Sequence, residues 1–235
     1  SEVHDISISD KYFSWGWNAK GVKPLPSQKM INFNRSFSYD KQGCLLHVLG
    51  AVPRYSIRMY SVPISSQMLK YIDDQLLFIN LLGESVRREV VLRGSMNEYG
   101  WNEVERIKEH YPALVECNAN KMQKSMKRAR LFVGTMNTTA FLEALAVNMP
   151  TIIFWNPSYW ELRECTIDDY NNLKKVGILH DSPESAAEMA HKVWDDIDSW
   201  WWRSDTQKAR AEFCFKFARM SSDWDDQWFD VLKNV

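Results

Sequence analysis

The stretch "ARLFVGTMNTTAFLEALAVNMPTIIFW", residues 129–155, decides the fold. It holds two apolar runs, "LFVG" and "TIIFW", which lack the polar alternation of a half-exposed strand. Runs of this kind are typical of strands that are covered on both faces of a parallel sheet. Between them, the apolar residues have helical spacing from about Thr138 to Val147. The stretch therefore predicts two neighbouring inner strands joined by a helix.

The same alternation of short apolar runs and helical segments extends on both sides. Further strands are expected at residues 43–52, 89–93 and 113–117, and helices at 65–82, 102–109 and 120–128, with a helical pattern from residue 184 onward. This order predicts an α/β fold, a Rossmann-like domain with a mainly parallel sheet and C-terminal helices. We expect a single domain over residues 1–235, in which residues 1–30 form an interdomain segment and residues 200–235 form the terminal helices.

Composition narrows the classes of function. With 29 basic and 30 acidic residues the formal net charge is −1, so no broad positive field attracts nucleic acid, and we expect at most peripheral membrane association. The four cysteines lack metal-ligand spacing, which favours a reducing compartment and indicates no metal site. No apolar run approaches the roughly 20 residues that span a bilayer. We therefore expect a cytoplasmic protein.

Three small polar residues, Asn137, Thr138 and Thr139, lie where the strand "LFVG" ends and the next helix begins. Ligands of open α/β folds bind at this carboxyl edge of the sheet. One interpretation is that Asn137 or Thr138 only caps the helix. The other is that the free amides and the positive end of the helix dipole bind a phosphate group. The sequence leaves both interpretations open.

Glu143 is the one carboxylate of this helix. It lies two residues from both Phe141 and Leu145, which is about 200° around a helix from each of them, so it cannot share their core face. We therefore expect the Glu143 side chain to face water or a ligand.

A second polar segment, residues 53–67, follows the first expected strand and brings Arg54 and Arg58 toward the same edge. Two arginines beside a helix start can fork onto phosphate oxygens, although surface arginines also pair with carboxylates. Ser65 and Ser66 either join them or cap the next helix. We predict that this segment shares one pocket with residues 137–139. The candidate phosphate-binding residues are Arg54, Arg58, Ser65, Ser66, Arg93, Asn137, Thr138 and Thr139.

The segment "FWNPSYWELRE", residues 154–164, follows the last inner strand at the same edge. Its two tryptophans can stack on a ligand ring, but packing in the core is the favoured interpretation. The charged residues that follow either orient sugar hydroxyls or form a solvated helix start. The candidate sugar-binding residues are Trp155, Glu161, Arg163 and Glu164.

The residues "NTTAFLEALAVNMPTIIF" resemble the nucleotide-sugar signature in the C-terminal domain of GT-B glycosyltransferases. In that fold the helix start holds the donor's phosphates and the glutamate binds its ribose. The resemblance therefore implies phosphate binding by residues 137–139 and ribose binding by Glu143, and it implies no resident cofactor, because the nucleotide sugar is the substrate.

A broader resemblance covers nearly the whole chain. Its residues are "HDISISDKYFSWGW", "RYSIRMYSVPISSQMLKYIDDQLLFI", "FLEALAVNMPTIIFWNPSYWELRE" and "GILHDSPESAAEMAHKVWDDIDSWW". They resemble the C-terminal half of a leptospiral-type family of surface-polysaccharide (O-antigen) transferases. The resemblance implies that an N-terminal lobe of that family lies outside this chain. The family often has a histidine before "YGW"; residues 95–97 contain none, so no catalytic residue is assigned.

These resemblances lead to one expected function and two alternatives. The chain is expected to be the donor-binding half of a GT-B-type glycosyltransferase, with a nucleotide-activated sugar and a glycan or lipid-linked acceptor as its partners. The first alternative is a polyol-phosphate transferase of the teichoic-acid type, which shares the architecture and differs in the group transferred. The second is a non-catalytic nucleotide-binding module.

Overall fold

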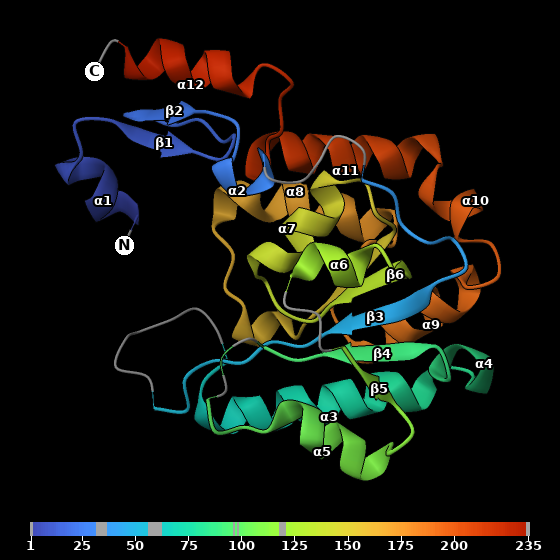
Figure 1. Cartoon of the computed structure of the whole chain (residues 1–235). Coiled ribbons are helices and arrows are strands. Elements are labelled where there is room, and N and C mark those ends of the chain that lie inside the picture. The colour runs from blue at the N-terminus through green and yellow to red at the C-terminus, as the bar shows by residue number, and fades with distance from the viewer. Residues whose placement is uncertain are drawn as a thin grey trace.

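The structure, a computed structural model, describes residues 2–31, 37–55, 63–95, 97, 99–117 and 121–233. Its centre is a six-stranded sheet in the order β5-β4-β3-β6-β7-β8, and every pairing in it is parallel (Figure 1). The strands are β3 (Cys44–Val48), β4 (Val90–Arg93), β5 (Val115–Glu116), β6 (Ala129–Gly134), β7 (Thr151–Phe154) and β8 (Leu179–His180). The predicted α/β fold with a mainly parallel sheet is confirmed.

β6 and β7 are neighbouring inner strands, as the sequence predicted. Phe132 pairs with Thr151, and Gly134 pairs with Ile153. All residues of β7 are buried, and so are all but one of β6. A strand whose successive side chains are buried is covered on both faces, which explains why these runs are apolar without alternation.

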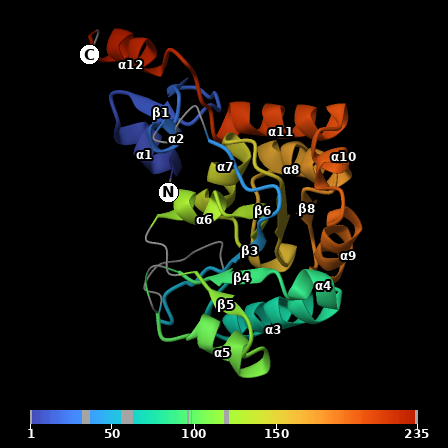
Figure 2. The same ribbon diagram turned by 45° about the vertical axis from the view of Figure 1, so that its right-hand side comes forward.

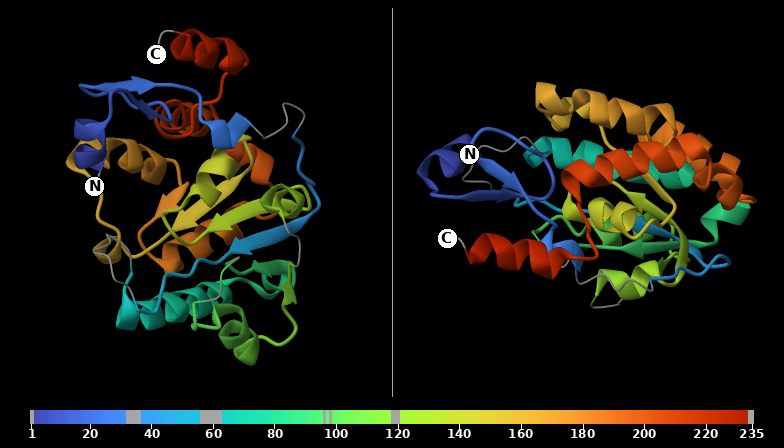
Figure 3. Two further views of the ribbon diagram at one scale, coloured as in Figure 1. Left: turned by 60° about the vertical axis from the view of Figure 1, so that its left-hand side comes forward. Right: turned by 90° about the horizontal axis from the view of Figure 1, so that it is seen from above.

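Helices cover both faces of the sheet (Figures 1 and 3). One face carries α3 (Ser65–Leu81), α5 (Glu103–His110) and α9 (Pro183–Val193). The other carries α6 (Met122–Met126), α7 (Thr139–Ala146) and α8 (Ile167–Lys175), with α11 (Ser204–Phe217) packed on α7 and α8. The remaining helical segments of these layers are α4 (Glu84–Arg87), α10 (Ile197–Trp201) and the short turns η1 (Pro157–Tyr159) and η2 (Glu164–Thr166). Within the described residues, no helix is both long and apolar enough to cross a membrane.

The order of the strands reverses between β3 and β6. The chain adds β4 and β5 on the outer side of β3, and then adds β7 and β8 on the outer side of β6. This is the strand order of dinucleotide-binding Rossmann folds, in which the crevice at the reversal, outside the carboxyl ends of the strands, holds the ligand. The segments that follow β3, β4 and β6 frame that crevice.

The first residues form a small substructure that periodicity did not predict. It consists of α1 (Glu2–Ile8), β1 (Tyr12–Ser14), β2 (Val22–Pro24) and α2 (Gln28–Ile31), and β1 pairs with β2. It lies beside the last helix, α12 (Trp224–Leu232), as Figures 1 and 2 show. Trp228 Nε1 donates to the Pro26 carbonyl at 3.0 Å, and its ring meets Phe13 edge-on at 5.3 Å. Strands of three residues are too short to reveal a sequence period.

Candidate functional site

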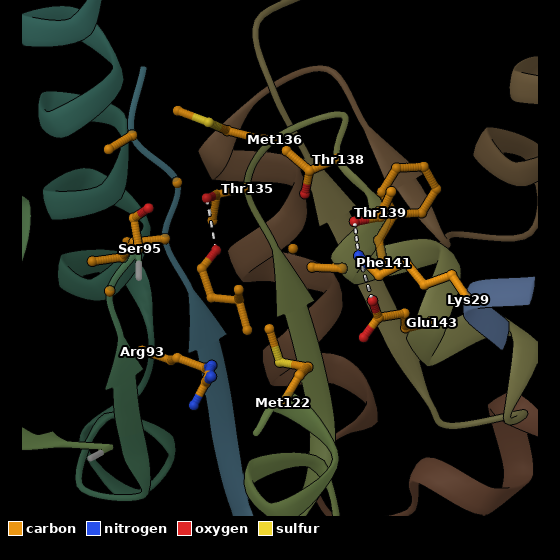
Figure 4. Close-up of a pocket in the computed structure, with 17 residues that line it drawn as sticks. Lys29, Arg93, Ser95, Met122, Thr135, Met136, Thr138, Thr139, Phe141 and Glu143 are labelled. Atoms are coloured by element: carbon orange, nitrogen blue, oxygen red, sulfur yellow. Dashed lines mark hydrogen bonds and ion pairs between the residues drawn. The ribbon is translucent and has the colours of Figure 1, made fainter. Parts of the chain in front are cut away.

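A pocket of about 330 Å³ lies in the crevice at the strand reversal (Figure 4). Its walls are residues 48–51 at and just after the end of β3, residues 93–95 at the end of β4, and the end of β6 with the first turn of α7. Met122 of α6 and Lys29 of α2 complete the lining. A concave site at this edge that combines apolar walls with a few polar groups is typical of a small-molecule binding site.

The first turn of α7 supplies hydrogen-bond donors to the pocket. Thr138 has an extended backbone and precedes the helix, and its side chain makes no capping hydrogen bond to any described residue. Thr138 N donates to the Met136 carbonyl at 2.9 Å, whereas the amides of Thr139, Ala140 and Phe141 have no acceptor within the helix. The helix dipole adds a partial positive charge at the same end. This wall of the pocket can therefore receive an anion.

The three polar residues that precede and open α7 do not act as one group. Thr138 and Thr139 line the pocket. Asn137 lies outside its lining, and its Oδ1 accepts a hydrogen bond from Tyr170 Oη of α8 at 3.3 Å. Asn137 therefore links the turn before α7 to α8.

Glu143 is buried, with 7% of its surface exposed, although it lines the pocket. Its Oε1 lies 2.9 Å from Lys29 Nζ, which also donates to Thr139 Oγ1 at 2.7 Å (Figure 4). Glu143 was expected to face water or a ligand; it is shielded from open water, with Lys29 of α2 against it, and it lines the candidate ligand pocket. The sequence carried no signal for Lys29, which is 110 residues from Thr139 and belongs to a segment without visible periodicity.

The opposite wall of the pocket carries a second cation, Arg93, at the end of β4 (Figure 4). The Arg93 side chain is buried, and its Nη1 donates to Ser125 Oγ at 2.8 Å. Arg93 thus lies in the pocket with Thr138, Thr139 and Glu143, as a shared site requires. β3 and β6 separate it from Lys29.

A buried network holds the two sides of the crevice together. Thr135 Oγ1 donates to the Val48 carbonyl at 2.8 Å and lies 2.6 Å from Tyr71 Oη. Because a threonine hydroxyl has one proton, Tyr71 must donate to Thr135. Tyr71 Oη in turn accepts from Gly50 N at 2.9 Å, and burial raises the pKa of Tyr71 above its usual value. The network ties the segment after β3 to the end of β6, and sequence reasoning did not single out Tyr71.

The segment after β3 does not bring Arg54 into the pocket. Arg54 is exposed, its Nη1 donates to the Gly100 carbonyl at 3.4 Å, and its guanidinium lies 5.5 Å from the centre of the Trp101 ring. The prediction that Arg54 shares a pocket with residues 137–139 is therefore wrong. Arg58 and the Ser65 side chain lie outside the described residues, so that prediction stays untested for them. Ser66 is exposed at the start of α3, outside the lining.

The candidate sugar-binding residues also lie outside this pocket. Trp155 is buried and packs its ring against Phe141, Trp160 and Tyr170. The structure thus favours the packing interpretation. Glu161, Arg163 and Glu164 are exposed, and Arg163 Nη2 lies 2.7 Å from Glu2 Oε2 of α1.

Several solved structures resemble the chain at low sequence identity. WaaG, a glycosyltransferase involved in lipopolysaccharide biosynthesis, is 16% identical with a TM-score of 0.44 over 93% of this chain and 58% of that one. The wall teichoic acid polymerase TagF is 11% identical with a TM-score of 0.44 over 98% and 58%. The C-terminal domain of the group 1 glycosyl transferase LpcC from Francisella tularensis is 10% identical with a TM-score of 0.42 over 80% and 90%. The chain spans a little over half the length of WaaG and TagF.

The family comparison covers almost every residue. Among curated proteins, no sequence matches this chain. The model of a family described as "LIC12162 family transferase" matches residues 1–232. The chain therefore belongs to the LIC12162 family of transferases.

Proposed function

We propose that this chain is the donor-binding half of a GT-B-type glycosyltransferase that uses a nucleotide-activated sugar. The observation that carries the proposal is the pocket at the strand reversal, where the start of α7 meets Lys29, Glu143 and Arg93. A helix start and two cations suit a phosphate group, and a carboxylate suits sugar hydroxyls. Membership of a transferase family supplies the reaction class.

In this proposal, the phosphates of the donor lie on the amides of Thr139, Ala140 and Phe141. Glu143 lies one turn further along α7, about 6 Å along the axis from Thr139, and accepts hydrogen bonds from the ribose. The contact with Lys29 engages Glu143 Oε1. Because a carboxylate has two oxygens with about four acceptor sites, Oε2 remains for a ribose hydroxyl.

The same groups suit the chemical step. Transfer breaks the bond between the anomeric carbon of the sugar and a phosphate oxygen, and it forms a bond from that carbon to a hydroxyl oxygen of the acceptor, which loses its proton. The nucleotide leaves with one more negative charge. Donors that already point at the place where charge develops stabilise the transition state. We assign this role to the α7 amides and to Arg93, and we assign no catalytic base.

The wider setting of the reaction is also a proposal. The acceptor is a glycan or a lipid-linked glycan, and the product belongs to a surface polysaccharide such as O-antigen. We infer a cytoplasmic protein with at most peripheral membrane contact. The four cysteines, all free thiols, and the net charge of −1 support this inference.

Calorimetric titration with UDP, GDP, CDP, ADP and dTDP tests the proposal. We expect one of them to bind, and we expect Glu143→Ala to weaken that binding about tenfold to a hundredfold, because a hydrogen bond to a charged group contributes about 1.5–3 kcal/mol. Lys41→Met is the matched control, since Lys41 pairs with Asp198 away from the pocket lining. Failure of all five to bind, or equal binding by wild type and Glu143→Ala, would contradict the proposal. A clear preference for a CDP-polyol over nucleotide sugars would favour polyol-phosphate transfer instead.

A further inference from the structure

A second cavity, of about 300 Å³, lies where the N-terminal substructure meets α8 and α11 (Figures 1 and 2). It is nearly as large as the donor pocket, the pocket at the strand reversal. The motif "YFSWGW", residues 12–17, forms one wall, and the proposed function assigns it no role. The aromatic lining consists of Tyr12, Phe13, Trp15 and Trp17 from this motif, with Tyr170 of α8 and Phe217 of α11 opposite.

The motif is held in one conformation by contacts with the end of α11. Gly16 has a φ of 137°, and a Cβ atom there would lie 2.1 Å from the Phe215 carbonyl oxygen, so glycine is required at this position. Arg219 N donates to the Trp15 carbonyl at 2.9 Å. Trp15 and Trp17, on either side of Gly16, therefore reach the cavity from a fixed turn.

The aromatic rings around the cavity form a cup and not a parallel slot. The rings of Tyr12 and Trp17 are inclined at 46°, with their centroids 6.1 Å apart. Those of Tyr170 and Phe217 are inclined at 41°, with their centroids 6.2 Å apart. A planar nucleobase is held best between parallel faces, because both of its own faces then stack. A sugar ring is puckered, and its C–H groups point in several directions, so it can contact inclined aromatic faces, which carry the negative end of the ring quadrupole.

The polar groups of the cavity suit an uncharged ligand that is rich in hydroxyl groups. Glu2 is the one charged residue among the described residues of the lining, and its Oε2 lies 2.7 Å from Arg163 Nη2. Arg163, a candidate sugar-binding residue from the sequence, thus reaches this cavity through Glu2. Burial and the Glu2 carboxylate raise the pKa of Tyr12, so its phenol stays protonated and can donate a hydrogen bond.

These charges count against two other classes of ligand. An anionic ligand would meet a carboxylate and no cation among the described residues of the lining. A hydrocarbon chain would remove water from the pair of Glu2 and Arg163 without replacing its hydrogen bonds, which costs free energy. Sugar hydroxyls can donate to the carboxylate and accept from the guanidinium. The cavity therefore combines an aromatic floor with a polar mouth that suits a sugar.

The cavity adjoins the donor pocket across α7. Leu142 lines the cavity, whereas its neighbours in the helix, Phe141 and Glu143, line the donor pocket. Tyr170 lines the cavity as well, and its hydroxyl donates to Asn137 Oδ1, in the turn before α7, at 3.3 Å. A ligand in the cavity thus lies beside the donor without taking its place.

We propose that this cavity binds an uncharged sugar ring of the acceptor glycan. This inference rests on the proposed function and specifies where the chain holds that glycan. The rings of the motif stack on the C–H groups of the sugar, and Glu2, Arg163 and Tyr12 hydrogen-bond its hydroxyls. Because α7 separates the cavity from the donor pocket, the sugar bound here positions the acceptor and is not the one whose hydroxyl reacts.

Titration of the whole chain with small glycosides tests the inference. The probes are the methyl pyranosides of glucose, galactose, mannose, rhamnose and N-acetylglucosamine, with uridine and geraniol representing a base and a hydrocarbon chain. Saturation-transfer NMR detects binding, and tryptophan fluorescence gives the dissociation constants, with and without a saturating nucleoside diphosphate. The variants are Trp17→Ala, Trp17→Phe and Glu2→Gln. Trp202→Ala is the matched control, because Trp202 is an exposed tryptophan outside the lining.

We expect at least one methyl pyranoside to bind, also when the diphosphate is present. Trp17→Ala should weaken that binding about threefold to tenfold, because a stacked aromatic contact is lost, and Trp17→Phe should keep most of it. Glu2→Gln should weaken it by a similar factor, since it removes a charged acceptor at a partly exposed site. Trp202→Ala should bind as wild type does. Glu2 lies at the mouth of the cavity, so Glu2→Gln tests the inference even if Trp17→Ala disturbs the fold.

Three results would overturn the inference while leaving the proposed function intact. The first is that none of the glycosides binds. The second is that neither Trp17→Ala nor Glu2→Gln weakens the binding. The third is that uridine or geraniol binds in place of the glycosides and is weakened by Trp17→Ala, which would assign the cavity to a base or to a hydrocarbon chain. By contrast, failure of the wild type to bind any nucleoside diphosphate would contradict the proposed function itself.

Discussion

The two segments that frame the crevice behave differently. The one after β6, residues 135–138, joins a buried strand directly to a helix. Two of the predicted site residues, Thr138 at its end and Thr139 at the start of α7, line the pocket. The one after β3, residues 49–64, is long, and its Arg54 turns toward Gly100 and Trp101. The position of a short connection is determined by the two elements that it joins. The path of a long connection depends on its own tertiary contacts.

The largest expected effect tests whether the core anchors α7. Phe141 is buried and packs against Trp155 and Phe213. Phe141→Ala should lower the free energy of unfolding by about 3–5 kcal/mol, because it leaves a cavity beneath the first turn of the helix. Urea denaturation measures this loss. A loss below about 1 kcal/mol would mean that the core does not fix the α7 wall, since that is within the range of ordinary substitutions.

The next effect concerns β3, on the other side of the crevice. His47 of β3 is fully buried, and burial lowers its pKa from 6.5 to about 4, although its Nε2 lies 2.9 Å from Gln75 Oε1. The unfolded chain therefore takes up a proton at a higher pH than the folded one. The contribution to stability is fully present above pH 6.5 and is lost as the pH falls toward 4, by about 3 kcal/mol in total.

Urea denaturation of wild type and His47→Gln at pH 7 and pH 4 measures this contribution. The loss of stability between the two pH values should be smaller in the variant by about that amount, since His47 no longer titrates. Equal losses of stability in wild type and His47→Gln would contradict the predicted contribution of His47. A positive result would show that His47 stays buried in the folded protein, so that β3 itself lies in the core as predicted.

Tyr71→Phe removes the hydroxyl that ties the two segments together. It leaves Gly50 N and Thr135 Oγ1 without a shared partner, so the free energy of unfolding should fall by about 1–2 kcal/mol. Binding of the nucleoside diphosphate should also weaken, because Gly50 and Thr135 both line the pocket. Denaturation and titration of the same variant measure both effects. If affinity is unchanged, the segment after β3 does not shape the site.

The smallest expected effects are on the stability of the empty protein, in variants of Glu143 and Arg54. Glu143→Ala should change the stability of the empty protein by about 1 kcal/mol or less, because its partner Lys29 is half-exposed and such pairs are weak. Arg54→Ala should change neither stability nor nucleotide affinity measurably, since Arg54 is exposed and outside the pocket lining. Thermal denaturation and calorimetry check both variants. A stability loss of about 3–5 kcal/mol in Glu143→Ala would mark a structural buried pair instead.

Much of the fold could be read from the sequence because periodicity reports burial. The apolar runs of β6 and β7 had no alternation, and both strands are covered on two faces. In α3, the apolar spacing of Met68, Leu69, Ile72, Leu76 and Ile79 predicted the helix. Met68, Ile72 and Ile79 are buried, whereas Leu69 is 48% exposed. The substructure from α1 to α2 escaped prediction because its strands have three residues each, and its packing against α12 depends on contacts such as that of Trp228 with Pro26.

The candidate site could be predicted only where topology determined it. Arg93, Thr138, Thr139 and Glu143 follow or adjoin ends of inner strands, and parallel strands bring those ends to one edge. Lys29 could not be found, because it reaches the pocket from a distant segment. The turn of Arg54 onto Trp101 could not be foreseen either, since it depends on tertiary contacts of a long connection.

The most direct test of the central claim is an experimental structure of the chain with the nucleoside diphosphate that it binds most tightly. The account predicts a phosphate on the amides of Thr139 to Phe141 beside Lys29 Nζ, with the ribose hydroxyls on Glu143. A nucleotide bound elsewhere would contradict it. Such places include the surface around Arg54 and the separate cavity of about 150 Å³ beside Arg130 and Trp194.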